Sequence, residues 1–230
     1  MKAVILAGGY GKRLRPLTNK VPKPLVEVAG KPILRWQIEW LRMHGFREVV
    51  LCVGYLKEKI MEYVGDGGVL GVKAYYAVED EPLGTGGAIK NAESVLQSEG
   101  KFLVLNGDVL TNLNPARLVD ALGGAAGALS LVPLRSSYGV IDVDERGVIR
   151  EFREKPLLPD YWINAGVYCF TPEILNHLPE RGDIESTSFP ELARRGRLVG
   201  VKYNDVYWRS IDTYKDLEVA ERELPRVRWR

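Results

Sequence analysis

The chain has 230 residues, of which 46% are hydrophobic and 27% charged, a composition typical of globular proteins and unlike that of disordered ones. Its formal net charge of +2 is too small to indicate a nucleic-acid partner. Length and composition together predict a single globular domain, and the charge does not require DNA or RNA as a partner.

Cysteines and apolar runs exclude several further classes. Cys52 and Cys169 stand far apart in apolar segments, without the spacing of a metal site. No apolar run approaches the ~20 residues of a membrane span, and the N-terminus lacks a signal-peptide layout. We therefore expect a cytoplasmic protein that does not bind a membrane.

In the first half, β-branched runs alternate with amphipathic segments. This pattern predicts strands at 3–7, 48–53, 72–77 and 101–105, and helices at 33–44, 57–64 and 86–97. Such an order indicates an α/β fold: a Rossmann-like, mostly parallel mixed sheet with helices on both faces and ligands at the carboxyl ends of its strands.

The second half has a different pattern of apolar and turn residues. This pattern predicts a helix at 115–122, a strand at 127–133, and a hairpin of 139–143 and 147–152 that turns at 144–147. Later elements are a strand at 165–170, short helices at 172–178 and 189–194, strands at 198–202 and 206–208, and a helix at 213–224. No Pro/Gly/Ser-rich linker separates the halves, so we expect a single domain over 1–230.

The N-terminal strand runs directly into a glycine loop with two cations. Gly8, Gly9 and Gly11 follow the strand, Arg13 comes next, and Lys23 lies between two prolines. Backbone N–H groups in such a loop can surround a phosphate, while Arg and Lys neutralise it. The loop therefore predicts a phosphate site; the alternative is a tight turn with solvated basic residues.

Two common phosphate motifs do not fit this loop. Leu14 stands where the third glycine of a dinucleotide G-x-G-x-x-G motif belongs. In a P-loop alignment, Leu6 replaces the first glycine, and Arg13 replaces the Ser or Thr that ligates Mg²⁺. Both failures point to another class of phosphate site.

Short motifs follow the loop in a fixed order along the chain. They occupy residues 8–18 with 22–24, 81–88, 106–108, 138–139, 154–156, 164–168 and 188–190. In this order and spacing they resemble the signature of the sugar-1-phosphate nucleotidyltransferases, the NDP-sugar pyrophosphorylases, over essentially the whole chain. The resemblance extends in particular to mannose-1-phosphate and heptose-1-phosphate guanylyltransferases.

This resemblance implies a glycosyltransferase-A type fold and a Mg²⁺-dependent reaction. The phosphate of a sugar 1-phosphate attacks the α-phosphorus of a nucleoside triphosphate, which expels pyrophosphate and leaves an NDP-sugar. The protein positions the phosphates and disperses charge, without a protein nucleophile. Arg13, Lys23 and Asp108 would be the catalytic residues. The expected nucleotide-binding residues are Leu6, Ala7, Gly8, Gly9, Gly11, Arg13, Lys23, Glu79, Gly84 and Asp108.

Two carboxylates are expected to hold the metal. Asp108 follows a buried strand and suits Mg²⁺; the alternative is that it caps a following helix. Many relatives carry the second Asp in a Trp-x-Asp-x-Gly-Thr motif, where this chain has Ser210 in the place of Asp and Asp212 in the place of Gly. We expect Asp108 and Asp212 to share the metal; the alternative is that Asp212 caps the helix near Thr213.

The side chain at position 79 bears on the choice of base. Relatives that bind thymine or uracil often carry Gln at the position aligned with Glu79, whereas an ionised Glu accepts hydrogen bonds only and suits the paired donors of guanine. Glu79 thus favours GTP, although some uridylyltransferases also have Glu here. Gly84 would let the base pack on the backbone.

On the sugar side, the resemblance implies that Lys155 binds the sugar phosphate, that Glu154 and Asn164 contact hydroxyls, and that Gly139 offers its backbone. The sugar-phosphate part would cover about 111–230 and the nucleotide part about 1–110. Mannose 1-phosphate is the favoured substrate. A heptose 1-phosphate is the alternative, through residues 81–90, and glucose or N-acetylmuramate 1-phosphate with UTP stays open.

A function of another class is also consistent with the chain. Some relatives are non-catalytic sensors of nucleotide sugars or regulatory subunits, and Ser210 is the one residue that supports this alternative. We expect no C-terminal β-helix domain after the final helix, and a homodimer is compatible with the sequence.

Overall fold

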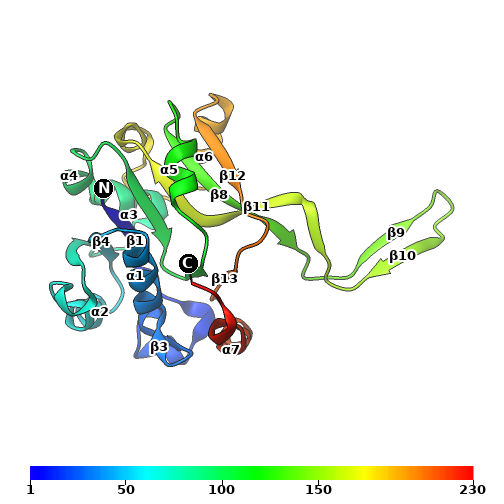
Figure 1. Cartoon of the computed structure of the whole chain (residues 1–230), viewed down its shortest axis with the longest axis horizontal. Helices are drawn as coiled ribbons and strands as arrows, with labels where there is room; N and C mark the ends of the chain where they lie inside the picture. Colours follow the sequence, from blue (N-terminus) through cyan, green and yellow to red (C-terminus); the bar gives the residue numbers. More distant parts are fainter. Residues whose placement is uncertain (230) are drawn as a thin grey trace.

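A seven-stranded sheet forms the centre of the computed structural model, which describes residues 1–229 (Figure 1). All neighbouring strands are parallel except β11, which is antiparallel to both β6 and β8. The predicted α/β fold with a mostly parallel mixed sheet is therefore confirmed. In spatial order the strands are β12 (Leu198–Lys202), β8 (Gly127–Arg135), β11 (Leu157–Phe170), β6 (Phe102–Asn106), β1 (Ala3–Ala7), β4 (Glu48–Val53) and β5 (Lys73–Val78).

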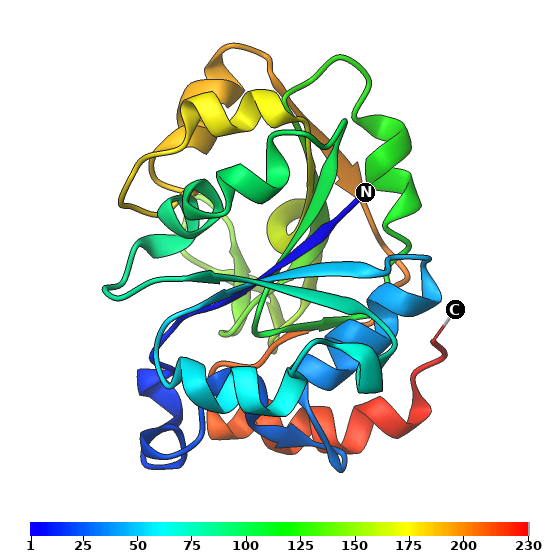
Figure 2. The ribbon, with the colours of Figure 1, turned by 90° about the vertical axis from the view of Figure 1, so that its left-hand side faces the viewer.

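Helices cover both faces of this sheet, as Figure 2 shows. Alternate residues of a strand point to opposite faces, so Ile5 and Val4 of β1 belong to two different cores. The core of Ile5 is covered by α1 (Ile33–Met43), α2 (Lys57–Val64) and α5 (Ala116–Ala121). The core of Val4 is covered by α3 (Gly84–Asn91), α4 (Glu93–Leu96), the 3-10 helix η5 (Pro172–His177) and α6 (Ser188–Arg194).

A third apolar cluster supports the glycine loop. Leu14 from the loop is fully buried against Val26, Ile211 and Ala220, the last of which lies in α7 (Tyr214–Glu223). The remaining short elements are η1 (Lys12–Leu14), η2 (Leu17–Asn19), η3 (Lys23–Leu25), β2 (Glu27–Val28), β3 (Lys31–Pro32), η4 (Gly68–Leu70) and η6 (Leu224–Arg226). The loop therefore rests on the C-terminal helix, about 200 residues later in the chain.

Four predicted elements differ from the structure. The strand expected at 165–170 is the last part of β11, which begins at Leu157. The helix expected at 86–97 is two helices, α3 and α4, because the N–H of Ala92 turns back to the carbonyl of Ile89. The helix expected at 172–178 is the 3-10 helix η5. The strand expected at 206–208 is wrong, since β13 (Trp208–Ser210) begins later and pairs outside the main sheet with β7 (Val109–Thr111), which the sequence analysis did not predict.

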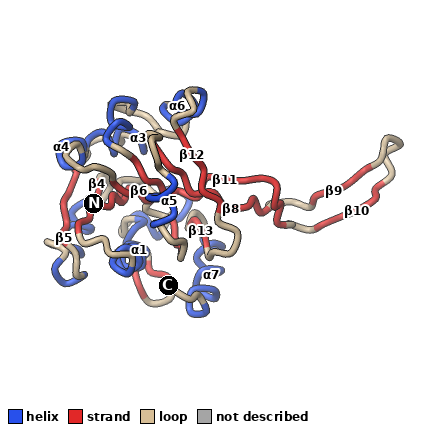
Figure 3. Tube along the Cα trace, turned by 45° about the horizontal axis from the view of Figure 1, so that its top comes forward, coloured by secondary structure: helices blue, strands red, loops and turns tan. Residues whose placement is uncertain are grey.

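A two-stranded arm extends from one side of the molecule (Figures 1 and 3). Its strands, β9 (Val140–Val143) and β10 (Ile149–Arg153), confirm the predicted hairpin. In its turn, Asp144 Oδ1 accepts the N–H of Arg146 at 3.0 Å and of Val148 at 2.9 Å. We call residues 135–161 the arm; it includes the ends of β8 and β11 that carry the hairpin. Within residues 1–229, no helix has the length and apolarity to cross a membrane.

Candidate functional site

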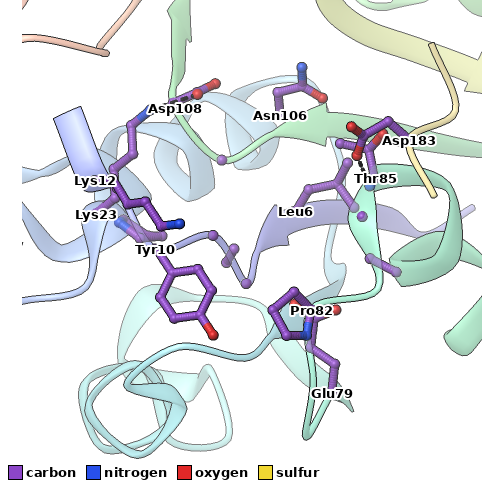
Figure 4. A pocket seen from close by; sticks show the side chains of 18 of the residues that line it. Leu6, Tyr10, Lys12, Lys23, Glu79, Pro82, Thr85, Asn106, Asp108 and Asp183 are labelled. Atoms are coloured by element: carbon purple, nitrogen blue, oxygen red, sulfur yellow. Dashed lines mark hydrogen bonds and ion pairs between the residues drawn. The ribbon is translucent and has the colours of Figure 1, made fainter. Parts of the chain in front are cut away.

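A cavity of about 380 Å³ lies at the carboxyl ends of β1 and β6, as expected for an open α/β sheet (Figure 4). All ten residues expected to bind the nucleotide line it, and so does Asp212. The full lining is Leu6, Ala7, Gly8, Gly9, Tyr10, Gly11, Lys12, Arg13, Lys23, Pro24, Glu79, Pro82, Gly84, Thr85, Ala88, Asn106, Gly107, Asp108, Asp183 and Asp212.

The glycine loop curves around one end of the cavity because of Gly11. This residue has a φ of 60°, in the left-handed region, and its carbonyl accepts the Thr18 hydroxyl at 2.9 Å and the Leu14 N–H at 2.9 Å. A Cβ at Gly11 would lie 3.1 Å from Cβ of Lys23. Glycine here lets the loop pass closely over Lys23.

Lys23 joins the two expected metal carboxylates. Its Nζ lies 2.7 Å from Oδ2 of Asp108 and 2.8 Å from Oδ1 of Asp212, and Nη2 of Arg13 lies 2.7 Å from the same Asp212 oxygen. The pairing of β7 with β13 creates this meeting, since the N–H of Ile211 donates to the carbonyl of Asp108 at 2.8 Å. Residues 104 positions apart are thus brought to one point.

The electrostatics of Asp212 favour its ionised form. Partial burial alone would raise the pKa of this carboxyl, but the hydrogen bond and charge of Lys23, with smaller contributions from Ser210 and Arg13, hold its pKa below the usual value. Ser210 donates its hydroxyl to Oδ2 of Asp212 at 2.8 Å. The serine that replaces the usual Asp therefore orients the displaced carboxylate.

Neither carboxylate caps a helix, so both capping alternatives are wrong. Thr213 is the N-cap of α7: its side chain accepts the N–H of Asp216, and Asp216 accepts the N–H of Thr213 at 2.8 Å. Asp108 is followed by β7 and not by a helix. Both carboxylates are free of the capping role and point to Lys23.

A divalent metal fits this pair of carboxylates. Oxygens of Asp108 and Asp212 converge on one ammonium group, which shows that one cation can contact both. Mg²⁺ commonly takes one or two protein carboxylates and completes its octahedron with phosphate oxygens and water. In the described part of the chain no cluster of three His, Cys, Asp or Glu offers a fuller cage. The residues present suit a metal that arrives with a phosphate.

Glu79 lies directly beneath the glycine loop, as expected. A Cβ on Gly8 would fall 1.9 Å from Oε1 of Glu79, and one on Gly54 would fall 2.6 Å from it, so both glycines make room for this carboxylate. Its Oε2 accepts the N–H of Leu83 at 3.1 Å. Burial raises the pKa of Glu79, and the Leu83 hydrogen bond opposes this only in part.

Several residues of the lining were not identified from the sequence. The ring of Tyr10 lies 5.0 Å from that of Tyr55 and under the ammonium of Lys12, at 5.5 Å; in Figure 4 it extends toward the side of the cavity that holds Pro82. Tyr10 and Lys12 lie inside the loop motif, whose variable positions carried no signal of their own. Thr85 and Asn106 likewise lie in the motifs at 81–88 and 106–108, whose pattern indicated no role for these two side chains.

Asp183 had no sequence signal, because it comes from a loop that only the fold brings to the cavity. Its Oδ1 accepts the N–H of Thr85 at 3.1 Å (Figure 4), and the carbonyl of its neighbour Gly182 accepts the N–H of Gly86 at 2.9 Å. The start of α3 is thus held by a segment almost 100 residues away.

The four expected sugar-phosphate residues do not line the cavity. Gly139, Glu154 and Lys155 lie in the arm, where Nζ of Lys155 contacts Oε1 of Glu154 at 3.2 Å and both side chains are more than half exposed. Asn164 lies in β11, where its Nδ2 donates to the Tyr168 hydroxyl at 2.7 Å. The structure therefore gathers the nucleotide set in the cavity, while the three arm residues of the sugar-phosphate set lie outside it.

A family model described as Nucleotidyl transferase matches residues 2–226. The chain belongs to this family. The resemblance drawn from the motifs is therefore confirmed, and the family model includes both the cavity and the arm.

Individual relatives agree with this. The mannose-1-phosphate guanylyltransferase catalytic subunit beta of Drosophila melanogaster is 39% identical over 223 residues, which are 94% of this chain and 60% of that protein. A D-glycero-alpha-D-manno-heptose 1-phosphate guanylyltransferase of Campylobacter jejuni is 38% identical over 176 residues, 76% of this chain and 78% of that one. The chain thus spans about three fifths of the length of the Drosophila relative.

Among solved structures, HddC from Yersinia pseudotuberculosis superposes with a TM-score of 0.78 at 29% identity. The superposition covers 97% of this chain and 99% of HddC. HddC has also been solved as a complex with GMP-PN.

Proposed function

We propose that the chain transfers a nucleotidyl group from a nucleoside triphosphate to a sugar 1-phosphate. An oxygen of the sugar phosphate forms a bond to the α-phosphorus, the bond between this phosphorus and the bridging oxygen to the β-phosphorus breaks, and pyrophosphate leaves. The observation that carries the proposal is the convergence of the glycine loop, Lys23, Asp108 and Asp212 at one end of a cavity whose other wall holds Glu79.

The residues at the loop end have distinct parts in this proposal. The N–H groups of Gly8, Gly9 and Gly11 surround the triphosphate, and Arg13 and Lys23 neutralise it. In the structure both cations are paired with Asp212, so they reach the phosphates by exchanging a carboxylate for a phosphate oxygen. Their positive charge then stabilises the charge that develops as pyrophosphate departs.

Asp108 and Asp212 would hold Mg²⁺ in exchange for Lys23. When bound, the metal supplies charge neutralisation to the phosphate oxygens. Lys23 loses both carboxylate partners in this exchange, which frees its ammonium for the triphosphate. Ser210 keeps Asp212 in place through the second carboxylate oxygen.

For the base, the proposal favours GTP. The buried carboxylate of Glu79 has Oε1 without a backbone donor comparable to the one at Oε2, and an acceptor here suits the N1–H and N2–H₂ of guanine. The Drosophila and Campylobacter relatives are guanylyltransferases, which supports the same base. A UTP–glucose-1-phosphate uridylyltransferase of Synechocystis, 32% identical over 262 residues, keeps UTP as the alternative.

For the sugar, mannose 1-phosphate is favoured and a heptose 1-phosphate is the alternative, following the two guanylyltransferase relatives. Lys155, Glu154, Asn164 and the backbone of Gly139 are proposed to bind it. Because these residues lie outside the cavity, the sugar phosphate must bind between the cavity and the arm, or the arm must move toward the cavity.

The test is pyrophosphate release with four nucleoside triphosphates and a panel of sugar 1-phosphates. The proposal predicts release with GTP and mannose 1-phosphate, and slower or no release with UTP. Release only with a heptose phosphate, or only with UTP, would show that this nucleotide and sugar phosphate are the substrates instead. No release with any pair, together with binding of an NDP-sugar, would contradict catalysis and favour a sensor.

A further inference from the structure

The arm has one apolar face that no part of the chain covers. Ile141 lies opposite Phe152, and Val143 lies opposite Ile149, so all four side chains share one face of the hairpin. A register shift between positions 149 and 151 brings Ile149 and Phe152 to the same side although they are three residues apart. Each of the four is about half exposed or more, and Phe152 is 61% exposed.

The opposite face of the arm is charged. Asp142 lies opposite Glu151, and Val140 lies opposite Arg153, whose Nε contacts Oε2 of Glu151 at 3.3 Å. The hairpin is therefore amphipathic, as a strand pair is when one of its faces is buried. An isolated two-stranded hairpin is at best marginally stable in water, which makes an uncovered apolar face here unfavourable.

Exposed apolar side chains are concentrated in the arm. Elsewhere in residues 1–229 the large exposed apolar side chains are spread over separate elements, such as Met43 in α1, Val69 in η4 and Tyr214 in α7. Eight of the seventeen large exposed apolar side chains described in residues 1–229 lie in the arm, so a second arm offers one arm an apolar surface of the same kind. The arm residues that are exposed and apolar are Tyr138, Ile141, Val143, Val148, Ile149, Phe152, Leu157 and Tyr161.

We propose that the arm is the interface of a homodimer, in which the apolar faces of two arms pack against each other. Such a contact is isologous, with the same residues on both sides, as in most two-fold dimers. The charges of the arm suit this partner. It has five basic residues and six acidic residues between positions 135 and 161, a balance that attracts neither nucleic acid nor an anionic membrane.

The area is also sufficient. Three of the eight side chains are aromatic, and 61–80% of each is exposed and open to burial. Only with all eight side chains does the arm offer an apolar area on the order of the ~800 Å² that each partner contributes to a standard interface, so the contact extends along the arm beyond the four residues of the hairpin face. Smaller contacts than this are typical of weak or transient encounters.

The first test measures the mass of the protein by light scattering during gel filtration, at low-micromolar concentration. Wild-type protein is expected to be a dimer, and Phe152→Glu and Ile141→Glu are expected to be monomers. Val69→Glu is the matched control, because Val69 is 99% exposed on the body, and it is expected to stay dimeric. A monomeric wild type, or dimers of both arm variants, would overturn the proposal.

A second test locates the contact by disulfide cross-linking. The native cysteines, Cys52 and Cys169, are buried and free, so the wild-type protein is not expected to cross-link. Single cysteines introduced as Ile141→Cys, Val143→Cys or Ile149→Cys are expected to give a cross-linked dimer under mild oxidation in at least one case, and Val69→Cys is not. A dimer that none of the three cross-links would contradict a face-to-face contact of the arms.

Discussion

The cavity and the arm hold their charged side chains in opposite ways. In the cavity, Lys23, Asp108 and Asp212 contact one another at 2.7–2.8 Å, and each is mostly shielded from solvent. In the arm, Glu154 and Lys155 contact mainly each other and are more than half exposed. Side chains fixed by several partners are positioned before the ligand arrives, whereas exposed ones must be ordered on binding. The proposed nucleotide site is therefore preorganised, and the part of the proposed sugar-phosphate site that lies in the arm is not.

This difference predicts that substitutions in the cavity act on the nucleotide and on the chemical step. Substitutions in the arm should act on the sugar phosphate or on assembly. The variants below test this division in order of expected effect.

The largest effect is expected for Asp212→Ala. Loss of a proposed metal carboxylate removes several kcal/mol of charge stabilisation, so turnover should fall by about 100-fold or more and the Mg²⁺ concentration for half-maximal rate should rise. Steady-state rates over a Mg²⁺ titration measure both. Ser210→Ala, which removes only the hydrogen bond to Oδ2 of Asp212, is the milder comparison. Wild-type rates and Mg²⁺ dependence in Asp212→Ala would contradict a shared metal site.

Arg13→Ala is expected to lower turnover by roughly 100-fold, because one cation that faces the leaving pyrophosphate is lost. The Arg13 side chain is largely exposed, and exposed ion pairs contribute about 0–1 kcal/mol to stability. The melting temperature should therefore change little. Kinetics and thermal melts of the same variant check this. A loss of stability as large as the loss of rate would indicate that the loop is only a structural turn.

Glu79→Gln should act oppositely on binding and on stability. Loss of a charged acceptor is expected to weaken GTP by roughly 10–100-fold and to improve UTP relative to GTP. The pKa of Glu79 is raised by burial, so the folded state binds more protons than the unfolded state just above the usual pKa of Glu, near ~4.3. Burial of the ionised Glu79 side chain therefore lowers the free energy of unfolding once the pH rises above the usual pKa of Glu.

The neutral amide escapes this cost, so Glu79→Gln should raise the free energy of unfolding at neutral pH. The gain should shrink as the pH falls toward the usual pKa of Glu. Denaturant unfolding at several pH values measures it. An equal change at every pH would show that packing, and not charge, causes the effect.

The smallest effect separates two neighbouring glycines. A Cβ at Gly8 would meet Oε1 of Glu79 at 1.9 Å, whereas a Cβ at Gly9 has no neighbour within 4 Å. Because the end of the Glu79 side chain can shift, Gly8→Ala should weaken GTP by about tenfold, a cost near 1.4 kcal/mol. Gly9→Ala should bind GTP like the wild type. Equal GTP affinities of the two variants, measured by calorimetry, would contradict the position given to Glu79.

The sequence predicted most of the sheet and eleven of the twenty residues that line the cavity, because apolar runs mark the strands and short motifs mark those residues. Strands at 3–7 and 48–53 follow from buried apolar runs, and the loop from its glycines. The break between α3 and α4 was missed because no Gly or Pro marks it. Asp183 and β13 were missed because their positions depend on pairing with segments about 100 residues away.

Asp212 shows how local spacing and long-range pairing combine. The spacing of two residues from Ser210 suggested that its carboxylate could replace the usual one, and the pairing of β13 with β7 brings it to Lys23. The position of Lys155 shows the opposite case. Its motif was readable, but its distance from the cavity depends on the direction of the arm, which no local pattern encodes.

The most direct test of the division between cavity and arm is a comparison of two constants in Lys155→Ala. The dissociation constant of GTP is measured by calorimetry, and the KM for the sugar 1-phosphate by pyrophosphate release. We predict that GTP binds as in the wild type, whereas the KM for the sugar phosphate rises by about 10–100-fold through loss of a charged phosphate contact. Weaker GTP binding with an unchanged sugar-phosphate KM would contradict the account.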